Sequence, residues 1–167
     1  MPRDIPVGNG QLLVAFDHHY RIRDLYYPHV GQENHAGGTP CHFGVWADLL
    51  PEADRRRKQR LYWSEQEWAI DLAYEPGTLA TRVTMRHQPL GVELRCQDVA
   101  DFHRPILVRR IEVHNTGDIQ RTFRIFHNNN FEMYGTKVGD TAYFEPRLDC
   151  LIHYRKVRYL MAGFYVG

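Results

Sequence analysis

A chain of 167 residues with a formal net charge of +1 at pH 7 is long enough for one domain, which at this size buries about 70% of the unfolded chain's surface. The near-neutral charge provides no field that would recruit nucleic acid or an anionic membrane, and no run of 18 apolar residues could span a bilayer. Met1 is followed by Pro-Arg-Asp and not by an apolar run, so a signal peptide is not expected. The cysteines (Cys41, Cys96 and Cys150) suggest neither a CxxC pair nor a disulfide framework. We therefore expect a soluble, cytoplasmic protein.

Short runs of β-branched and aromatic residues recur along the chain and predict strands. The predicted strands are Leu12–Phe16, Ile22–Tyr27, His42–Asp48, Trp68–Tyr74, Leu79–Arg86, Val92–Asp98, Ile106–Asn115, Arg121–Phe131, Thr141–Phe144, Leu151–Tyr154 and Tyr159–Met161. Several alternate apolar and polar residues, as a sheet with one buried face requires.

Turn residues separate the predicted strands, as in Gly8-Asn9-Gly10 and Glu75-Pro76-Gly77. No window has a helical apolar stripe, and Pro51–Trp68 has room for one helical turn at most. The sequence predicts an all-β antiparallel sandwich that forms a single domain over residues 1–167. The basic run Arg55-Arg56-Arg57-Lys58 indicates a solvated loop, because no second basic cluster or nucleic-acid motif accompanies it.

The side chains that could carry chemistry do not form a recognisable catalytic or metal motif. His18 and His19 are adjacent, so on a strand they would point to opposite faces and could not share an ion unless the turn reorients them. Asp24 and Glu33 are the local candidates for the paired carboxylates of a sugar hydrolase. However, no second acid lies near Glu33 in the sequence with a recognisable catalytic signature. We predict no catalytic residue, no metal site and no cofactor.

The loop that follows the predicted Leu12–Phe16 and Ile22–Tyr27 hairpin concentrates aromatic, amide, imidazole and carboxylate groups. Aromatic faces stack on pyranose rings, but they anchor cores and interfaces as often. The predicted carbohydrate or domain-interface contacts are Tyr26, Tyr27, His29, Gln32, Glu33, Asn34, His35 and, on a later strand, Trp46.

Several segments together resemble the start of bacterial and archaeal glucoamylase-like proteins of glycoside hydrolase family 15. The resemblance covers nearly the whole chain up to about Arg158. The segments are Pro6–Gly10, Asp17, Tyr20–Pro28, Val30–His35, Phe43–Trp46, Leu79–Thr81, Leu90–Leu94, Phe123–His127 and His153–Arg155.

The resemblance implies the N-terminal domain of that family, an antiparallel β super-sandwich related in shape to galactose mutarotase. In the family an (α/α)6 barrel follows and hydrolyses α-glucosidic bonds with inversion; its catalytic glutamates match no position here, so the chain alone is expected to be inactive. The family's sandwich is also longer, so we expect the domain to be incomplete and its open sheet edges to pair with a second copy, unless it folds as a reduced sandwich.

Three functions remain open at this point. The first is a noncatalytic domain that packs against or assists a helical catalytic domain. The second is a free-standing carbohydrate-binding module that holds α-glucan through Tyr26, Tyr27 and Trp46. The third is an epimerase or lyase-like enzyme on a mutarotase-type sandwich, which would need histidine and acid pairs converging in one cleft.

Overall fold

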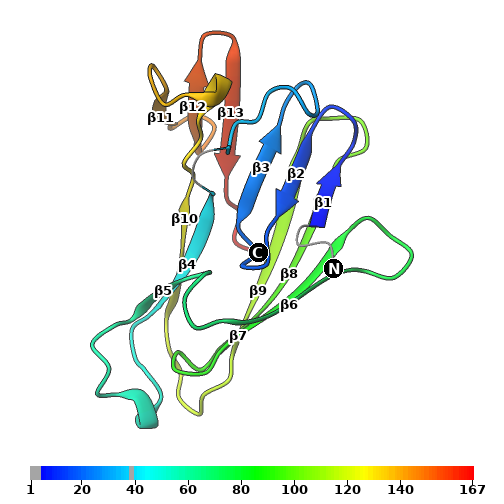
Figure 1. Cartoon of the computed structure of the whole chain (residues 1–167). Helices are drawn as coiled ribbons and strands as arrows, with labels where there is room; N and C mark the ends of the chain where they lie inside the picture. The colour runs from blue at the N-terminus through cyan, green and yellow to red at the C-terminus, as the bar shows by residue number, and fades with distance from the viewer. Residues whose placement is uncertain (1–4, 38–39) are drawn as a thin grey trace.

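In a computed structural model, the protein consists of strands joined by turns (Figure 1). The structure describes residues 5–37 and 40–167. The strands within these ranges are β1 (Ile5–Gly8), β2 (Leu13–Phe16), β3 (Ile22–Tyr26), β4 (His42–Ala47), β5 (Leu61–Trp63), β6 (Ala69–Tyr74), β7 (Thr81–His87), β8 (Val92–Ala100), β9 (Leu107–Asn115), β10 (Phe123–Asn128), β11 (Thr141–Glu145), β12 (Cys150–Arg155) and β13 (Arg158–Gly163). Two single 3-10 turns, η1 (Glu52–Asp54) and η2 (Met133–Gly135), are the helical elements of the described chain. The predicted all-β class is confirmed.

Antiparallel pairing between consecutive strands builds three of the four sheets. The strands β1-β2-β3, β6-β7-β8-β9 and β11-β12-β13 form meanders, in which short turns set each register. The fourth sheet has the order β10-β4-β5, with Phe123 of β10 opposite Ala47 of β4. This pairing places the late strand β10 beside the much earlier strand β4.

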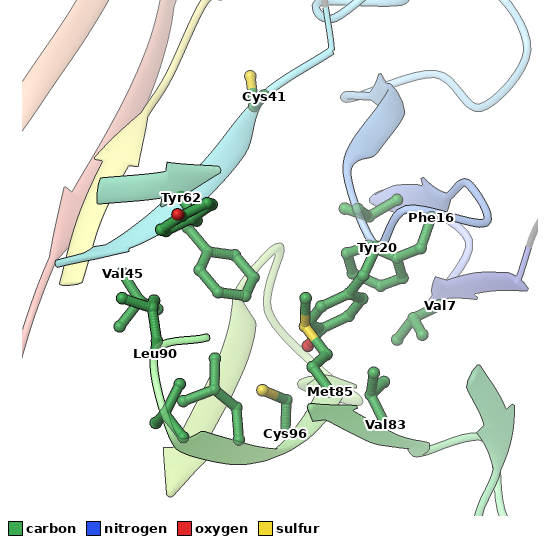
Figure 2. Close-up of a cluster of buried hydrophobic side chains, with 14 of the residues drawn as sticks. Val7, Phe16, Tyr20, Cys41, Val45, Tyr62, Val83, Met85, Leu90 and Cys96 are labelled. Carbon is green, nitrogen blue, oxygen red and sulfur yellow. The ribbon is translucent and has the colours of Figure 1, made fainter. Parts of the chain in front are cut away.

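Two layers enclose the main core. The β6–β9 sheet forms one layer, and the β1–β3 and β10-β4-β5 sheets, joined by a bridge between Ile22 and Cys41, form the other. Figure 2 shows Phe16 and Tyr62 from the second layer and Met85 from the first pointing into the space between them. The arrangement confirms the predicted antiparallel sandwich.

The alternation of side chains explains why the β6–β9 sheet has one buried face and one solvent-exposed face. In β7, Val83 and Met85 are buried, while Arg86 points outward and donates to Glu93 of β8 at 2.7 Å. Glu93 also accepts from Arg95 at 2.9 Å. The burial of the apolar face drives the two layers together.

A buried ion pair within the β6–β9 sheet is linked to the other layer by a tyrosine. Asp98 of β8 is fully buried and accepts from the Nε of Arg109 in β9 at 2.7 Å and from the hydroxyl of Thr81 at 2.8 Å. Tyr20, in the β2–β3 turn, donates its hydroxyl to the same carboxylate, and its ring centroid lies 4.5 Å from the Arg109 guanidinium carbon. Burial raises the pKa of Tyr20, which keeps its phenol protonated.

All eleven predicted strands are present, with shifted ends. The strands β1 and β5 were not predicted, and the predicted strand Arg121–Phe131 is shorter, because β10 spans Phe123–Asn128. The stretch Pro51–Trp68 holds one helical turn, as predicted, and the basic run is an exposed loop. All three cysteines are buried free thiols.

Candidate functional site

The loop after β3 is closed by its own backbone and by one asparagine. Tyr26 bridges to Asn34, and the amide of His35 donates to the carbonyl of Leu25 at 2.7 Å. The Asn34 side chain accepts from the amides of Leu25 and Ala36, both at 3.1 Å. Asn34 therefore shapes the loop, and its side chain is occupied by protein groups.

His35 is the most deeply buried of the predicted site residues. Its Nε2 lies 2.6 Å from the carbonyl oxygen of Tyr27, and its own carbonyl accepts from the amide of Glu132 at 2.8 Å. Its ring meets that of Tyr134 edge to face at 6.4 Å. The loop is thereby fixed to the segment around η2, and His35 has no access to solvent.

Glu33 binds an arginine that lies far along the chain. Its two carboxylate oxygens accept from Nε and Nη2 of Arg158 in β13, each at 2.8 Å. The hydrogen bond from Arg158 lowers the pKa of Glu33. A carboxylate held ionised by a bidentate ion pair is poorly suited to donate a proton to a leaving group. The other carboxylate candidate, Asp24, accepts from Arg23 and, at 2.6 Å, from Asn34.

The exposed part of the loop is small. His29 and Gln32 point to solvent, while Tyr26 and Tyr27 are half-buried and Tyr27 packs against the core. The structure thus connects the loop to η2 through His35 and to β13 through Glu33, and leaves the tip of the loop for a ligand.

Trp46 lies on another surface, the outer face of the β10-β4-β5 sheet. The Arg124 guanidinium carbon is 5.0 Å from its ring centroid. On the same face the ring of Trp63 stacks on that of His42, with centroids 4.6 Å apart and planes 10° apart. Phe126 is 43% exposed beside them.

Polar groups border this aromatic face. The Nδ1 of His42 lies 2.9 Å from a carboxylate oxygen of Glu65, and its Nε2 lies 3.0 Å from the Asn128 amide nitrogen. Sequence reasoning missed Trp63, His42 and Phe126 as one group. The period of two within β4 and β10 was visible, but the register that aligns them was not.

The described surface includes a small cavity and a larger cleft. A cavity of about 100 Å³ near β11 and β12 is lined in part by Asp140 and His153, and a cleft of about 340 Å³ lies between η1 and the turn around Gly117. Binding pockets for small molecules have volumes of about 300–1,000 Å³, so the acid and imidazole pair faces a space below that range. Among the described residues, no group of three or more His, Cys, Asp or Glu side chains is placed to hold a metal ion.

Comparison of the chain with protein-family models, with curated proteins and with solved structures found no match. In the described part of the chain, no helix has the length and apolarity needed to cross a membrane.

Proposed function

We propose that this chain is a noncatalytic β-sandwich domain that packs against a helical catalytic domain acting on α-glucosidic carbohydrates. The partner is the kind found in the glucoamylase-like proteins of glycoside hydrolase family 15, which the sequence resembles. The observation that carries the proposal is an uncovered apolar surface on the β11–β13 sheet. Figure 1 shows this sheet at the top of the molecule.

This surface, which we term the tyrosine face, consists of Tyr143, Tyr154, Tyr159 and Met161. The register places all four side chains on one side of the sheet. Tyr154 stacks on Tyr159 with ring centroids 5.6 Å apart and meets Tyr143 edge to face at 6.0 Å. Tyr143, Tyr159 and Met161 are 44%, 56% and 60% exposed.

A contiguous apolar patch of ordered aromatic rings is typical of a protein interface. Tyrosine suits such an interface because its ring supplies contact area while its hydroxyl remains hydrogen-bonded. Arg158, the first residue of β13, points to the side of the sheet opposite Tyr159, so its pair with Glu33 holds the loop after β3 on that opposite side and leaves the tyrosine face uncovered.

A binding experiment tests this proposal. A separately produced helical catalytic domain from a glucoamylase-like protein of the family is titrated with the 167-residue chain by calorimetry, and we expect saturable binding that Met161→Glu abolishes. Leu79→Glu is the matched control, because Leu79 is 73% exposed on the β6–β7 turn. Absence of binding, or equal loss with both variants, would contradict the proposal. Glucose release from maltooligosaccharides by the chain alone would contradict its noncatalytic character.

The aromatic face of the β10-β4-β5 sheet favours a second candidate, a surface that binds α-glucan. A sugar ring needs an apolar surface for its C–H groups and planar polar groups for its hydroxyls, and Trp63, Phe126, His42 and Asn128 offer both. Maltohexaose should then quench tryptophan fluorescence in the intact chain and fail to do so after Trp63→Ala. No quenching in the intact chain would remove this candidate.

A further inference from the structure

The strand β9 is a long edge strand. It is nine residues long and ends the β6-β7-β8-β9 sheet, with β8 as its ladder partner. Its pairing with β8 runs without a shift from Leu107 opposite Ala100 to Asn115 opposite Val92. The outer edge of β9 therefore presents a regular row of backbone donors and acceptors.

Proteins usually protect such edges with proline, with a bulge or with a charge that points inward. Between Leu107 and Asn115 there is no proline and no bulge. The inward-pointing Arg109 is held by Asp98 in the core, so its charge does not guard the edge. An edge with this geometry is suited to pair with another strand.

We propose that two copies of this chain associate through antiparallel pairing of their β9 strands, centred on Ile111. A two-fold axis perpendicular to the sheet keeps the inner face of each copy on the same side and joins two four-stranded sheets into one. In this register Leu107 of each copy faces Asn115 of the other, so all nine residues are paired.

Charge complementarity selects this register. With Ile111 on the axis, Arg110 of each copy lies opposite Glu112 of the other, which forms two symmetric pairs of opposite charge. The two neighbouring registers that preserve the faces place Arg110 opposite Arg110 or Glu112 opposite Glu112 on the axis. Like charges directly opposite one another destabilise a ladder, so these alternatives are disfavoured.

The surrounding side chains fit the same arrangement. Arg110 and Glu112 are exposed by 69% and 38% and contact each other along one strand, so both can turn toward a neighbour. Glu112 also lies opposite Arg95 of β8, which places it between two arginines in the dimer. On the inner face Val113 is 39% exposed, and pairing would cover it.

Charge reversal gives the test. We expect the 167-residue chain to form a dimer in sedimentation equilibrium, and Arg110→Glu or Glu112→Arg alone to weaken dimerisation about tenfold or more. An equimolar mixture of the two variants should restore association, because one strand becomes acidic and the other basic at these positions. Asp71→Arg, on the opposite edge strand β6, is the matched control and should leave the dimer intact.

Circular dichroism of each variant establishes that it is folded. A chain that remains monomeric at every concentration would overturn the proposal. Self-association that is unchanged in both single variants, or a mixture that fails to associate, would overturn it equally, since each outcome removes the pairing between Arg110 and Glu112.

Discussion

Replacing Arg109 with methionine should destabilise the fold by about 3 kcal/mol. Removing one partner of a buried ion pair costs about 3–5 kcal/mol, because the remaining charge stays in the low-dielectric interior. The Arg109 side chain is 13% exposed and that of Asp98 is fully buried, so water does not screen the pair. We choose the lower limit because Tyr20 and Thr81 still donate to Asp98 in the variant.

Urea denaturation followed by circular dichroism measures this loss, and the melting temperature should fall by roughly 6–12 °C for a domain of this size. Arg86→Met is the matched control, because Arg86 lies 63% exposed on the outer face. The double variant Asp98→Asn/Arg109→Met should be more stable than Arg109→Met, since it removes the orphaned charge. A single variant as stable as the native chain, or a double variant with fully additive losses, would refute the reasoning.

Three further predictions concern pH and local packing. Burial lowers the pKa of His87 and of His127 to about 4, so between pH 6.5 and pH 4 these histidines bind protons in the unfolded chain but not in the folded chain. Their contribution to stability is therefore present above pH 6.5 and is lost as the pH falls towards 4. Replacing both by glutamine should flatten this pH dependence of stability in urea denaturation. Gly44→Ala should cost about 1–3 kcal/mol and shift tryptophan emission, because the added Cβ would lie 2.8 Å from Cε3 of Trp63; an unchanged spectrum would count against the stacked position of that ring. Glu33→Gln should speed amide exchange in the loop after β3 by weakening its pair with β13, whereas unchanged protection would show that the pair does not hold the loop.

The strands that the sequence predicts are those with enough alternation to show a period of two. β7 and β8 are long and bury every second residue, so their pattern is plain. β1 is four residues long and contains Pro6, and β5 is three residues long and directly follows the polar stretch that includes the basic run, so neither shows a period. Short strands of this kind are fixed by the sheet that they join and not by their own residues.

The site residues depend on contacts that local sequence does not contain. The partner of Glu33 is Arg158, and the loop is anchored through His35 to Glu132. Both partners lie far from the loop in the sequence. Likewise, Arg109 belongs to a strand that has polar residues on both faces, so its burial is not visible in the strand's own pattern. That burial depends on the ion pair that Arg109 forms with Asp98. The sequence therefore indicates which loop is distinctive, while long-range pairing decides whether its groups are occupied by protein.

Hydrogen exchange of the chain with and without a helical catalytic domain from a glucoamylase-like protein tests the proposed function most directly. We predict slower exchange in β11–β13, beneath the tyrosine face, when the helical domain is present. Unchanged exchange in these segments at saturating helical domain would contradict the proposal that this sandwich is a docking partner of such a domain.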